Sequence, residues 1–125
     1  MKRLLILLFA LLPLLAHARE YDHAQWNPAI AAFEAADRAH APAPGSILFI
    51  GSSSIEHWKS LPADFPGIAV INRGFGGSEL PDSTYYVGRI VAPYHPRAVV
   101  LYAGDNDLQD GHSPQQVCDG FADFV

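Results

Sequence analysis

The sequence predicts an α/β fold in which a parallel sheet is covered by helices on both faces. Three runs are apolar throughout, Ile47 to Ile50, Ile68 to Ile71 and Ala98 to Tyr102, and segments with helical spacing separate them. Strands that are apolar at every position are typical of parallel sheets in chains that alternate strands with helices. Ligands bind such sheets at the carboxyl ends of the strands, so the loops there are the candidate site loops.

Composition and charge limit the classes of function. Half of the 125 residues are hydrophobic and 17% are charged, which is typical of a globular protein. The formal net charge is -5, and basic residues are adjacent only at Lys2 and Arg3. Because nucleic acids and anionic membranes bind clustered Lys and Arg, neither is expected as a partner. The single cysteine, Cys118, excludes an intrachain disulfide, and it is expected to be a small core residue of a helix.

Residues 1–18 have the pattern of a secretory signal peptide. A charged start is followed by an apolar stretch from Leu4 to Leu15 and by the cleavage pattern Ala16-His17-Ala18. We therefore expect export, with the mature protein in the periplasm or outside the cell. An uncleaved anchor is the alternative, although the stretch is short for a membrane span and contains Pro13. After cleavage no stable membrane span is expected, and the remainder is long enough for one small domain.

Residues 19–45 are predicted to form an N-terminal helix and a proline-rich linker. Residues 19–26 have mixed polarity and are expected to run extended over the surface. Asn27-Pro28 is typical of a helix start, and the alanine-rich segment that follows predicts a helix to His40. Its buried face is expected to contain Ile30, Phe33 and Ala36. The proline-rich run 41–45 ends this helix and leads into the first strand.

A loop or helix is predicted after each strand. The first strand is followed by a helix from Ser53 to Leu61. The second is followed by a loop from Asn72 to Ser78 and by a helix from Ser83 to Val91, with Pro81 as the breaker before it. The third is followed by a loop from Gly104 to Asp110.

The last predicted helix has a clear start signal. Ser113 and Gln116 fit a capping box, and Pro114 stands in the first turn. The buried face of this helix is expected to contain Val117, Phe121 and Val125.

The loop after the first strand reads Gly51-Ser52-Ser53-Ser54. A turn at the carboxyl end of a buried strand exposes a side chain and directs the first free N–H groups of the next helix toward a ligand. A serine in that position can be a nucleophile. The alternative is purely structural, because serine after glycine is also a preferred helix N-cap.

The three loops at the strand ends are the segments richest in Gly, Ser, Asn and Asp. Acyl transfer needs an exposed nucleophile, donors for the developing oxyanion, and a general base. Ser53 offers the nucleophile, and Asn106 can donate through its side-chain amide. Glycines in the second loop allow backbone N–H groups to approach a reacting carbonyl. We therefore expect an acyl-transfer site at this edge of the sheet.

Together the three loops resemble the sequence blocks of the SGNH hydrolases, the GDSL-like esterase and lipase family. Gly51-Ser52-Ser53 stands where that family has Gly-Asp-Ser, so the resemblance makes Ser53 the nucleophile and Ser52 the replacement for the aspartate. Gly77 matches the glycine that donates its N–H to the oxyanion hole. Gly104-Asp105-Asn106-Asp107 matches the Gly-x-Asn-Asp block, which makes Asn106 the second oxyanion donor.

The resemblance covers about residues 47–110 and implies a fold and an activity. The fold would be a flavodoxin-like three-layer sandwich, usually with five parallel strands. The activity would be hydrolysis of acyl or acetyl esters of small molecules, carbohydrates or lipids, with no cofactor and no metal. The family's base lies in an Asp-x-x-His block, and no such block follows Asp107. Residues 46–125 are therefore expected to be a partial SGNH hydrolase domain, truncated after the third strand.

Two other functions stay open. A serine-rich loop at a helix N-terminus is also typical of phosphate binding, as in flavodoxin-like modules that hold a flavin phosphate. A relative of the same fold can also keep the cleft as a catalytically inactive binding protein.

Three further features have more than one interpretation. His112, with Asp110 nearby, is either a local base or a solvated loop histidine. Arg73 binds a substrate carboxylate or pairs with an aspartate of the chain. The aspartates from Asp105 to Asp110 lack the Gly and Glu positions of a calcium loop, so we expect Asp107 to fix loop geometry by accepting hydrogen bonds from backbone N–H groups.

Overall fold

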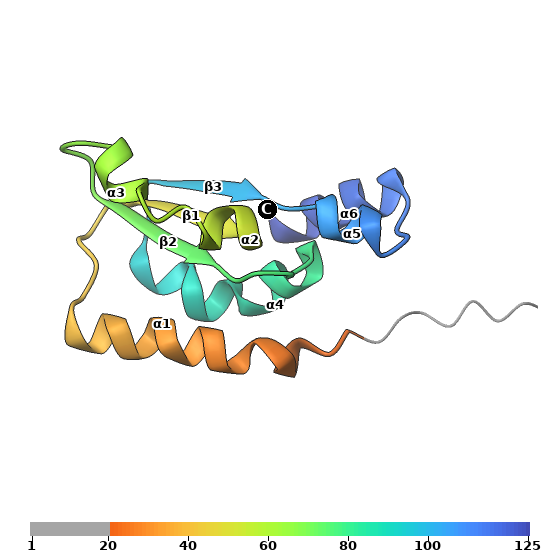
Figure 1. Ribbon diagram of the computed structural model, residues 1–125, viewed down its shortest axis with the longest axis horizontal. Helices are drawn as coiled ribbons and strands as arrows, with labels where there is room; N and C mark the ends of the chain where they lie inside the picture. Colours follow the sequence, from red (N-terminus) through yellow and green to blue (C-terminus); the bar gives the residue numbers. More distant parts are fainter. Residues whose placement is uncertain (1–20) are drawn as a thin grey trace, which may run out of the picture.

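The computed structural model describes residues 21–125, and the predicted signal peptide lies outside them (Figure 1). Three parallel strands form one sheet in the order β2-β1-β3, with bounds β1 (Ile47–Gly51), β2 (Val70–Gly74) and β3 (Ala98–Tyr102). The α-helices are α1 (Asn27–Ala39), α2 (Ser53–Glu56), α3 (Leu61–Asp64), α4 (Leu80–Ile90), α5 (Asp105–Gln109) and α6 (Pro114–Phe124). Two short 3-10 helices are η1 (His23–Trp26) and η2 (Ala92–Tyr94). The predicted α/β class with a parallel sheet is confirmed.

The central strand β1 aligns the carboxyl ends of its two neighbours. Gly51 lies opposite Gly74 of β2 and Tyr102 of β3. The first and third strands were predicted within one residue, because apolar runs bounded by polar or glycine residues mark them. The second strand begins at Val70 and ends at Gly74, two residues later than predicted at its start and three at its end. It continues past Ile71 through polar residues, Asn72 and Arg73, whose side chains have partners on other elements.

Arg73 is a buried cation inside β2. Its guanidinium donates to both carboxylate oxygens of Asp37 of α1 at 2.7 Å, and it lies over the rings of Phe33 and Tyr94, 5.0 and 4.7 Å from their centroids. The predicted ion pair with an aspartate is therefore confirmed. The pair fastens α1 to the edge of the sheet.

Side chains of β1 alternate between two cores, as the pleat of a strand requires. One face is covered by α1 and α4, which lie on the same side of the sheet (Figure 1). The core there contains Ile30, Leu48, Ile50, Tyr86 and Ile90. Phe49 faces the opposite side, where Ile55 of α2 and Leu61 of α3 pack against it.

The helix predicted from Ser53 to Leu61 is wrong in its extent, because two short helices occupy this stretch. Side chains take the carbonyl groups that a continuous helix would use. The amide of Asn72 donates to the Ile55 carbonyl at 2.7 Å, and the ammonium of Lys59 donates to the Glu56 carbonyl at 2.8 Å. Competition of this kind ends a helix early.

The start of α4 was predicted three residues too late. Glu79 is its N-cap, and the side chains of Glu79 and Asp82 each accept a hydrogen bond from the other's backbone N–H. Pro81, predicted to break the chain before the helix, lies in the first turn, where no backbone donor is needed.

The predicted loop from Gly104 to Asp110 contains the short helix α5. Asp105 and Asp107 lie in its first turn, where carboxylates stabilise the positive end of the helix dipole. The predicted start of α6 is confirmed, since Ser113 and Gln116 form the capping box.

The buried face of α6 differs from the prediction. Phe121 and Val125 are 52% and 84% exposed, whereas Phe124 packs against the larger core. The side of α6 that meets α4 includes Gly120 instead: a Cβ there would lie 3.3 Å from Cβ of Leu80. The prediction for Cys118 is also wrong, because its thiol is exposed.

The segment before α1 is more ordered than predicted. Within the described part, residues 23–26 form η1, and Asp22 caps it by accepting from the Ala24 N–H at 3.1 Å. Trp26 is the N-cap of α1, and Pro28 lies in the first turn. In α1, the expected burial of Ile30 is confirmed, whereas Ala36 is exposed. Within residues 21–125, none of the helices has the length and hydrophobicity that a membrane span requires.

Candidate active site

The loops after the strands meet at the carboxyl edge of the sheet. The N–H of Phe75 donates to the carbonyl of Gly51 at 3.0 Å and holds the second loop beside the first. A Cβ on Gly74 would lie 2.1 Å from the backbone nitrogen of Glu56, and one on Gly51 would lie 2.0 Å from the carbonyl oxygen of Tyr102. Backbones approach so closely at both positions that only glycine fits.

Ser53 is the first residue of α2 and is half-buried. The N-cap before it, Ser52, accepts the N–H groups of Ile55 and Glu56 through its backbone carbonyl, at 3.1 and 3.0 Å. Its side chain makes no capping hydrogen bond, and its buried hydroxyl has no hydrogen-bond partner among the described residues. Side-chain capping, the structural alternative for the serine-rich loop, is therefore wrong for Ser52.

Gly76 lies between Ser53 and the carboxylate of Glu56. A Cβ at Gly76 would lie 3.7 Å from Cβ of Ser53 and 2.4 Å from Oε2 of Glu56. The second loop thus passes directly beside the predicted nucleophile. The sequence pattern pointed to Gly77 and gave no signal that separates Gly76 from the glycines around it.

Gly77, the first predicted oxyanion donor, is exposed and has a φ of +82°, in the region that favours glycine. A Cβ there would lie 3.2 Å from Cη2 of Trp26. Trp26 is held by an edge-to-face contact with Phe75, with ring centroids 5.7 Å apart. The loop at Gly77 therefore rests on a fixed aromatic surface that sequence reasoning missed.

Asn106, the second predicted oxyanion donor, lies beside the same loop. Its Nδ2 donates to the carbonyl of Ser78 at 2.9 Å. A side-chain amide carries two N–H bonds, and this hydrogen bond uses one of them. Gly76, which lies near Ser53, and Ser78, which accepts the hydrogen bond from Asn106, thus stand on either side of Gly77 in the chain.

Asp107 joins the third loop to α4. Both of its carboxylate oxygens accept the N–H of Leu80 at 3.2 Å, which confirms the prediction that Asp107 fixes loop geometry. Burial raises the pKa of Asp107 above its ordinary value, because a site with little water disfavours the charged form. Hydrogen bonds from backbone N–H groups oppose this effect.

Two histidines lie near this edge, and neither contacts Ser53 among the described interactions. The side chain of His57, at the end of α2, is 72% exposed and lies 3.8 Å from Oε2 of Glu56. Nε2 of His112 lies 3.0 Å from the hydroxyl of Tyr21 and 3.2 Å from Oε2 of Glu79. The solvated-loop interpretation of His112 is therefore wrong, because a residue from the start of the described chain packs on it.

Residues 21–26, which we name the N-terminal strap, are tied to α4. Nδ1 of His23 forms a 2.7 Å hydrogen bond with Oδ1 of Asp82, and its ring stacks on Tyr85 with centroids 4.2 Å apart. The hydroxyl of Tyr86 donates to the carbonyl of His23. No pattern in the sequence predicted the packing of the strap. The Glu-x-x-Asp spacing of residues 79 and 82 does fit a reciprocal capping pattern at the start of α4, where the strap packs.

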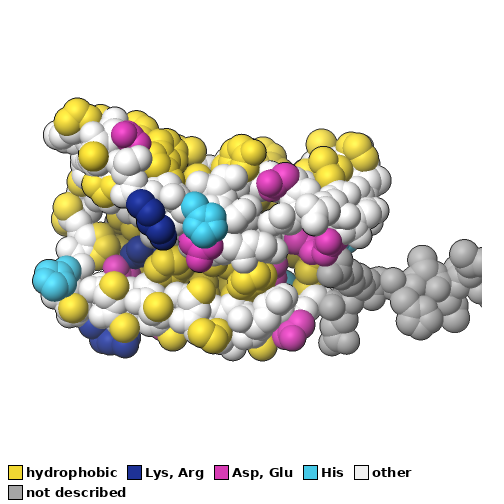
Figure 2. Space-filling view, viewed as in Figure 1, with side chains coloured by type: hydrophobic (Ala, Val, Ile, Leu, Met, Phe, Trp, Pro, Cys, Tyr) yellow, Lys and Arg dark blue, Asp and Glu magenta, His cyan; other side chains and the backbone are white. Residues whose placement is uncertain are grey.

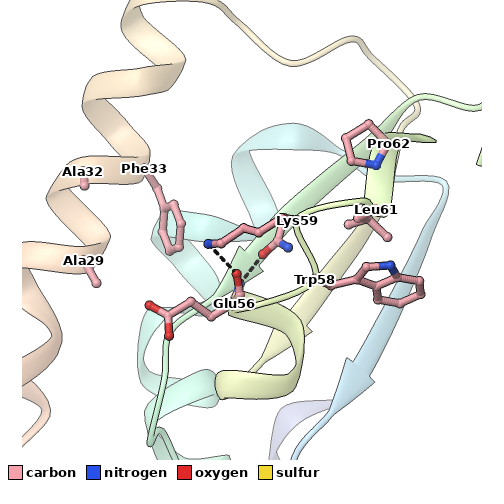
Figure 3. Close-up of a pocket in the computed structure, with 10 residues that line it drawn as sticks. Ala29, Ala32, Phe33, Glu56, Trp58, Lys59, Leu61 and Pro62 are labelled. Atoms are coloured by element: carbon pink, nitrogen blue, oxygen red, sulfur yellow. Dashed lines mark hydrogen bonds between the residues drawn. The ribbon is translucent and has the colours of Figure 1, made fainter. Parts of the chain in front are cut away.

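Two cavities flank the second loop. One, of about 440 Å³, lies between α1 and the α2–α3 segment and is lined by Glu56 and Gly74, where the surface is hollowed (Figures 2 and 3). The other, of about 270 Å³, is lined by Trp26, Gly77 and Glu79. The loop that runs beside Ser53 therefore lies between the two cavities. Across residues 21–125, no group of three or more His, Cys, Asp or Glu side chains is arranged to hold a metal ion.

Comparison with known proteins supports the fold. No protein-family model and no curated protein matches the chain. Solved structures do match, among them a Streptococcus pneumonia protein with the provisional name platelet activating factor. It superposes with a TM-score of 0.65 at 17% identity, over 80% of this chain and 47% of its own. The chain thus spans about half the length of that protein, and the two share the expected α/β architecture with a parallel sheet between helices.

Proposed function

We propose that this protein is a serine hydrolase of the SGNH or GDSL type that acts on acyl or acetyl esters. Oγ of Ser53 attacks the ester carbonyl, and the N–H groups of Ser53 and Gly77 and the amide of Asn106 hold the oxygen that becomes negative. The closeness of Gly76 to Ser53 and the hydrogen bond from Asn106 to Ser78 support this proposal, because the second loop then lies beside the first and is bonded to the third.

The chemistry divides into two steps. Attack forms a tetrahedral intermediate, and its collapse breaks the bond to the alcohol and leaves the acyl group on Ser53. Water then releases the acid. A serine hydroxyl is a weak nucleophile unless a base accepts its proton. The resemblance assigns that role to an Asp-x-x-His block, and no such block follows Asp107 in this sequence, so the mechanism is incomplete in the chain as given. A reagent that reacts with Ser53 directly therefore tests the proposal.

The test is mass spectrometry after treatment with a fluorophosphonate. We expect one adduct, on Ser53, that disappears in Ser53→Ala. Ser54→Ala is the matched control, since Ser54 is the next hydroxyl of the same loop and is exposed. An adduct that persists in Ser53→Ala would contradict the assignment. A folded wild-type chain without any adduct would mean that Ser53 is not activated in this chain.

We also propose that the protein is exported through residues 1–18. The support is the sequence pattern of a charged start, an apolar stretch and a small-residue cleavage site. Expression of the full chain with its N-terminus, followed by intact-mass measurement of the periplasmic fraction, should give a species that begins at Arg19. Retention of Met1 in the recovered protein would contradict export by cleavage.

A further inference from the structure

Residues 75–78 of the second loop form a tight turn whose type follows from the backbone. The N–H of Ser78 donates to the carbonyl of Phe75 at 3.3 Å, so Gly76 and Gly77 are the two central residues. The φ of Gly77 is +82°, whereas that of Gly76 is not positive. A negative φ at the first central residue and a φ of about +80° at the second are typical of a type II turn. The candidate oxyanion donor therefore belongs to a turn of defined type.

The turn type decides which way the N–H of Gly77 points. That N–H belongs to the peptide group between the two central residues, and this peptide group is turned over between type I and type II. One orientation presents the N–H to a given side of the loop, and the other presents the carbonyl oxygen of Gly76 there. A carbonyl oxygen repels a developing oxyanion, so only one of the two turn types serves an oxyanion hole.

The two glycines do not choose between these orientations by themselves. Glycine adopts positive and negative φ about equally readily, so a Gly-Gly turn is able to take either type. Within residues 21–125 the N–H of Gly77 also has no acceptor that would hold it in place. A neighbouring group is therefore needed to keep one orientation.

Trp26, the last residue of the N-terminal strap, contacts this turn at two places. Cη2 of its ring would lie 3.2 Å from a Cβ on Gly77. The same ring meets Phe75 edge to face, with centroids 5.7 Å apart. The indole thus lies against the first and third residues of the turn, where it opposes a change in their relative position.

The position of Trp26 is fixed through the chain on both sides of it. The hydroxyl of Tyr86 of α4 donates to the carbonyl of His23 and lies 3.0 Å from Oδ1 of Asn27. Nδ1 of His23 forms its 2.7 Å hydrogen bond with Asp82, also of α4. Contacts with one helix therefore hold the residues that precede and follow the indole.

The indole N–H of Trp26 brings no hydrogen bond to the fold. Nε1 is buried and has no hydrogen-bond partner within the described residues. A buried donor without an acceptor lowers stability, and phenylalanine at this position would avoid that cost. What the indole offers beyond a phenyl ring is the contact of its outer ring with Gly77.

We propose that Trp26 is a positioning residue, which keeps the Gly76–Gly77 peptide in the type II orientation and so directs the N–H of Gly77. The contact between ring and glycine is made at the observed φ of +82°, so it stabilises this orientation relative to the turned-over one. The use of the N–H as an oxyanion donor rests on the proposed function, whereas the effect of Trp26 on the turn does not.

The first arm of the test measures the turn itself by NMR. The amide protons of Gly76 and Gly77 are far apart in a type II turn and close in type I, because ψ of the first central residue changes from about +120° to about −30°. We expect a weak NOE between them in the wild type and one at least about threefold stronger in Trp26→Phe. The phenyl ring still packs on Phe75 but ends short of Gly77.

The chain offers a matched control for this substitution. Trp58 packs edge to face on Phe49, in the core on the other side of the sheet, so Trp58→Phe should leave the NOE weak. If Trp26→Phe does not fold by circular dichroism, Trp26→Leu removes the same contact with a smaller side chain. A strong NOE in the wild type, or a weak one in the folded Trp26 variant, would overturn the proposal.

The second arm measures labelling of Ser53 by a fluorophosphonate over a range of reagent concentrations. In Trp26→Phe we expect the rate constant at saturation to fall at least about threefold, and by no more than the roughly 10²- to 10³-fold that loss of a whole oxyanion donor costs. The half-saturating concentration should change less than about twofold, because the N–H acts on charge that develops during the reaction. Trp58→Phe should change neither constant. A fall in stability alone would not separate the two constants in this way.

The two proposals fail separately. An NOE that responds to Trp26→Phe, in a protein whose wild type is not labelled at Ser53, would support control of the turn by Trp26 and contradict the hydrolase. Labelling of Ser53 that is as fast in Trp26→Phe as in wild type would support the hydrolase and contradict the positioning role.

Discussion

Both carboxylate oxygens of Asp107 accept the backbone N–H of Leu80, at 3.2 Å each, and so join the loop that carries Asn106 to the first turn of α4. Asp107→Ala removes the acceptor for a buried N–H and is expected to lower the free energy of unfolding by about 1–3 kcal/mol. Asp107→Asn keeps one acceptor oxygen and is the matched variant. We expect stability to fall in the order wild type, Asp107→Asn, Asp107→Ala, and urea unfolding of the three proteins at pH 7 checks this order. Equal loss in both variants would mean that charge, and not the hydrogen bond, holds the loop.

Stability should also depend on pH through Asp107. Burial raises the pKa of this carboxyl above its unfolded value, so the folded state holds the proton more tightly. The contribution to stability is fully present below the unfolded pKa and is lost as pH rises through the raised pKa. The unfolding free energy of Asp107→Asn minus that of wild type should therefore be more positive at pH 7 than at pH 4. An unfolding free-energy difference that is the same at both pH values would contradict this.

Gly77→Ala should disturb the site through its backbone. The residue has a φ of +82°, and a Cβ would press on the ring of Trp26 at 3.2 Å. The left-handed conformation costs an L-residue about 1–2 kcal/mol, before any shift of the ring. Gly88→Ala is the control, because Gly88 lies within α4 with open space around it and alanine there should stabilise by about 0.5–1 kcal/mol. Thermal unfolding followed by circular dichroism should give shifts of opposite sign.

The buried pair of Arg73 and Asp37 should be costly to break. Asp37→Ala leaves the guanidinium without its carboxylate partner, with an expected loss of about 3–5 kcal/mol in unfolding free energy. The hydroxyl of Tyr94, which donates to Asp37 in the wild type, also loses its acceptor. Glu34→Ala removes the more exposed pair with Arg89 and should change little. Chemical denaturation measures the unfolding free energy of both variants. Equal losses would show that the buried pair contributes no more to stability than the exposed pair.

The outer side of β3 should promote self-association. Val99 and Val100 are each 40% exposed and Tyr102 is 52% exposed, and apolar side chains line the edge of the molecule over β3 and the α5–α6 end (Figure 2). An open apolar strand edge is a template for pairing with another chain. Val99→Lys should reduce the concentration dependence of the sedimentation coefficient. Ile68→Lys changes a 39% exposed residue before β2 and should leave the concentration dependence as it is. Equal effects of the two substitutions would mean that the added positive charge, and not its position on β3, prevents association.

The strands and the three site loops could be predicted because their signals are local. Ile47–Ile50 is an apolar run that stops at Gly51, Ala98–Tyr102 is one that is followed within two residues by Gly104, and the blocks around Ser53, Gly77 and Asn106 stand after apolar runs of this kind. The structure brings these three loops into contact. The resemblance added roles that periodicity alone does not supply, and these roles remain predictions.

The parts that could not be predicted depend on contacts between distant residues. The break after Glu56 requires the amide of Asn72, and the position of β2 requires a partner for Arg73 from α1. The buried side of α6 includes Gly120, which lies against Leu80 of α4. None of these pairs is visible as a spacing in the sequence, because each joins different elements of the fold.

The N-terminal strap has a consequence for the order in which the molecule is completed. Tyr21 contacts His112 across a separation of 91 residues, and His23 contacts Asp82 across 59. During synthesis the strap emerges before the residues that receive it. Contacts of such long range close large loops and form slowly. The candidate active site, which includes Asn106 and adjoins the strap at Gly77, is therefore completed only when contacts between distant parts of the described chain have formed, which makes it a late product of folding.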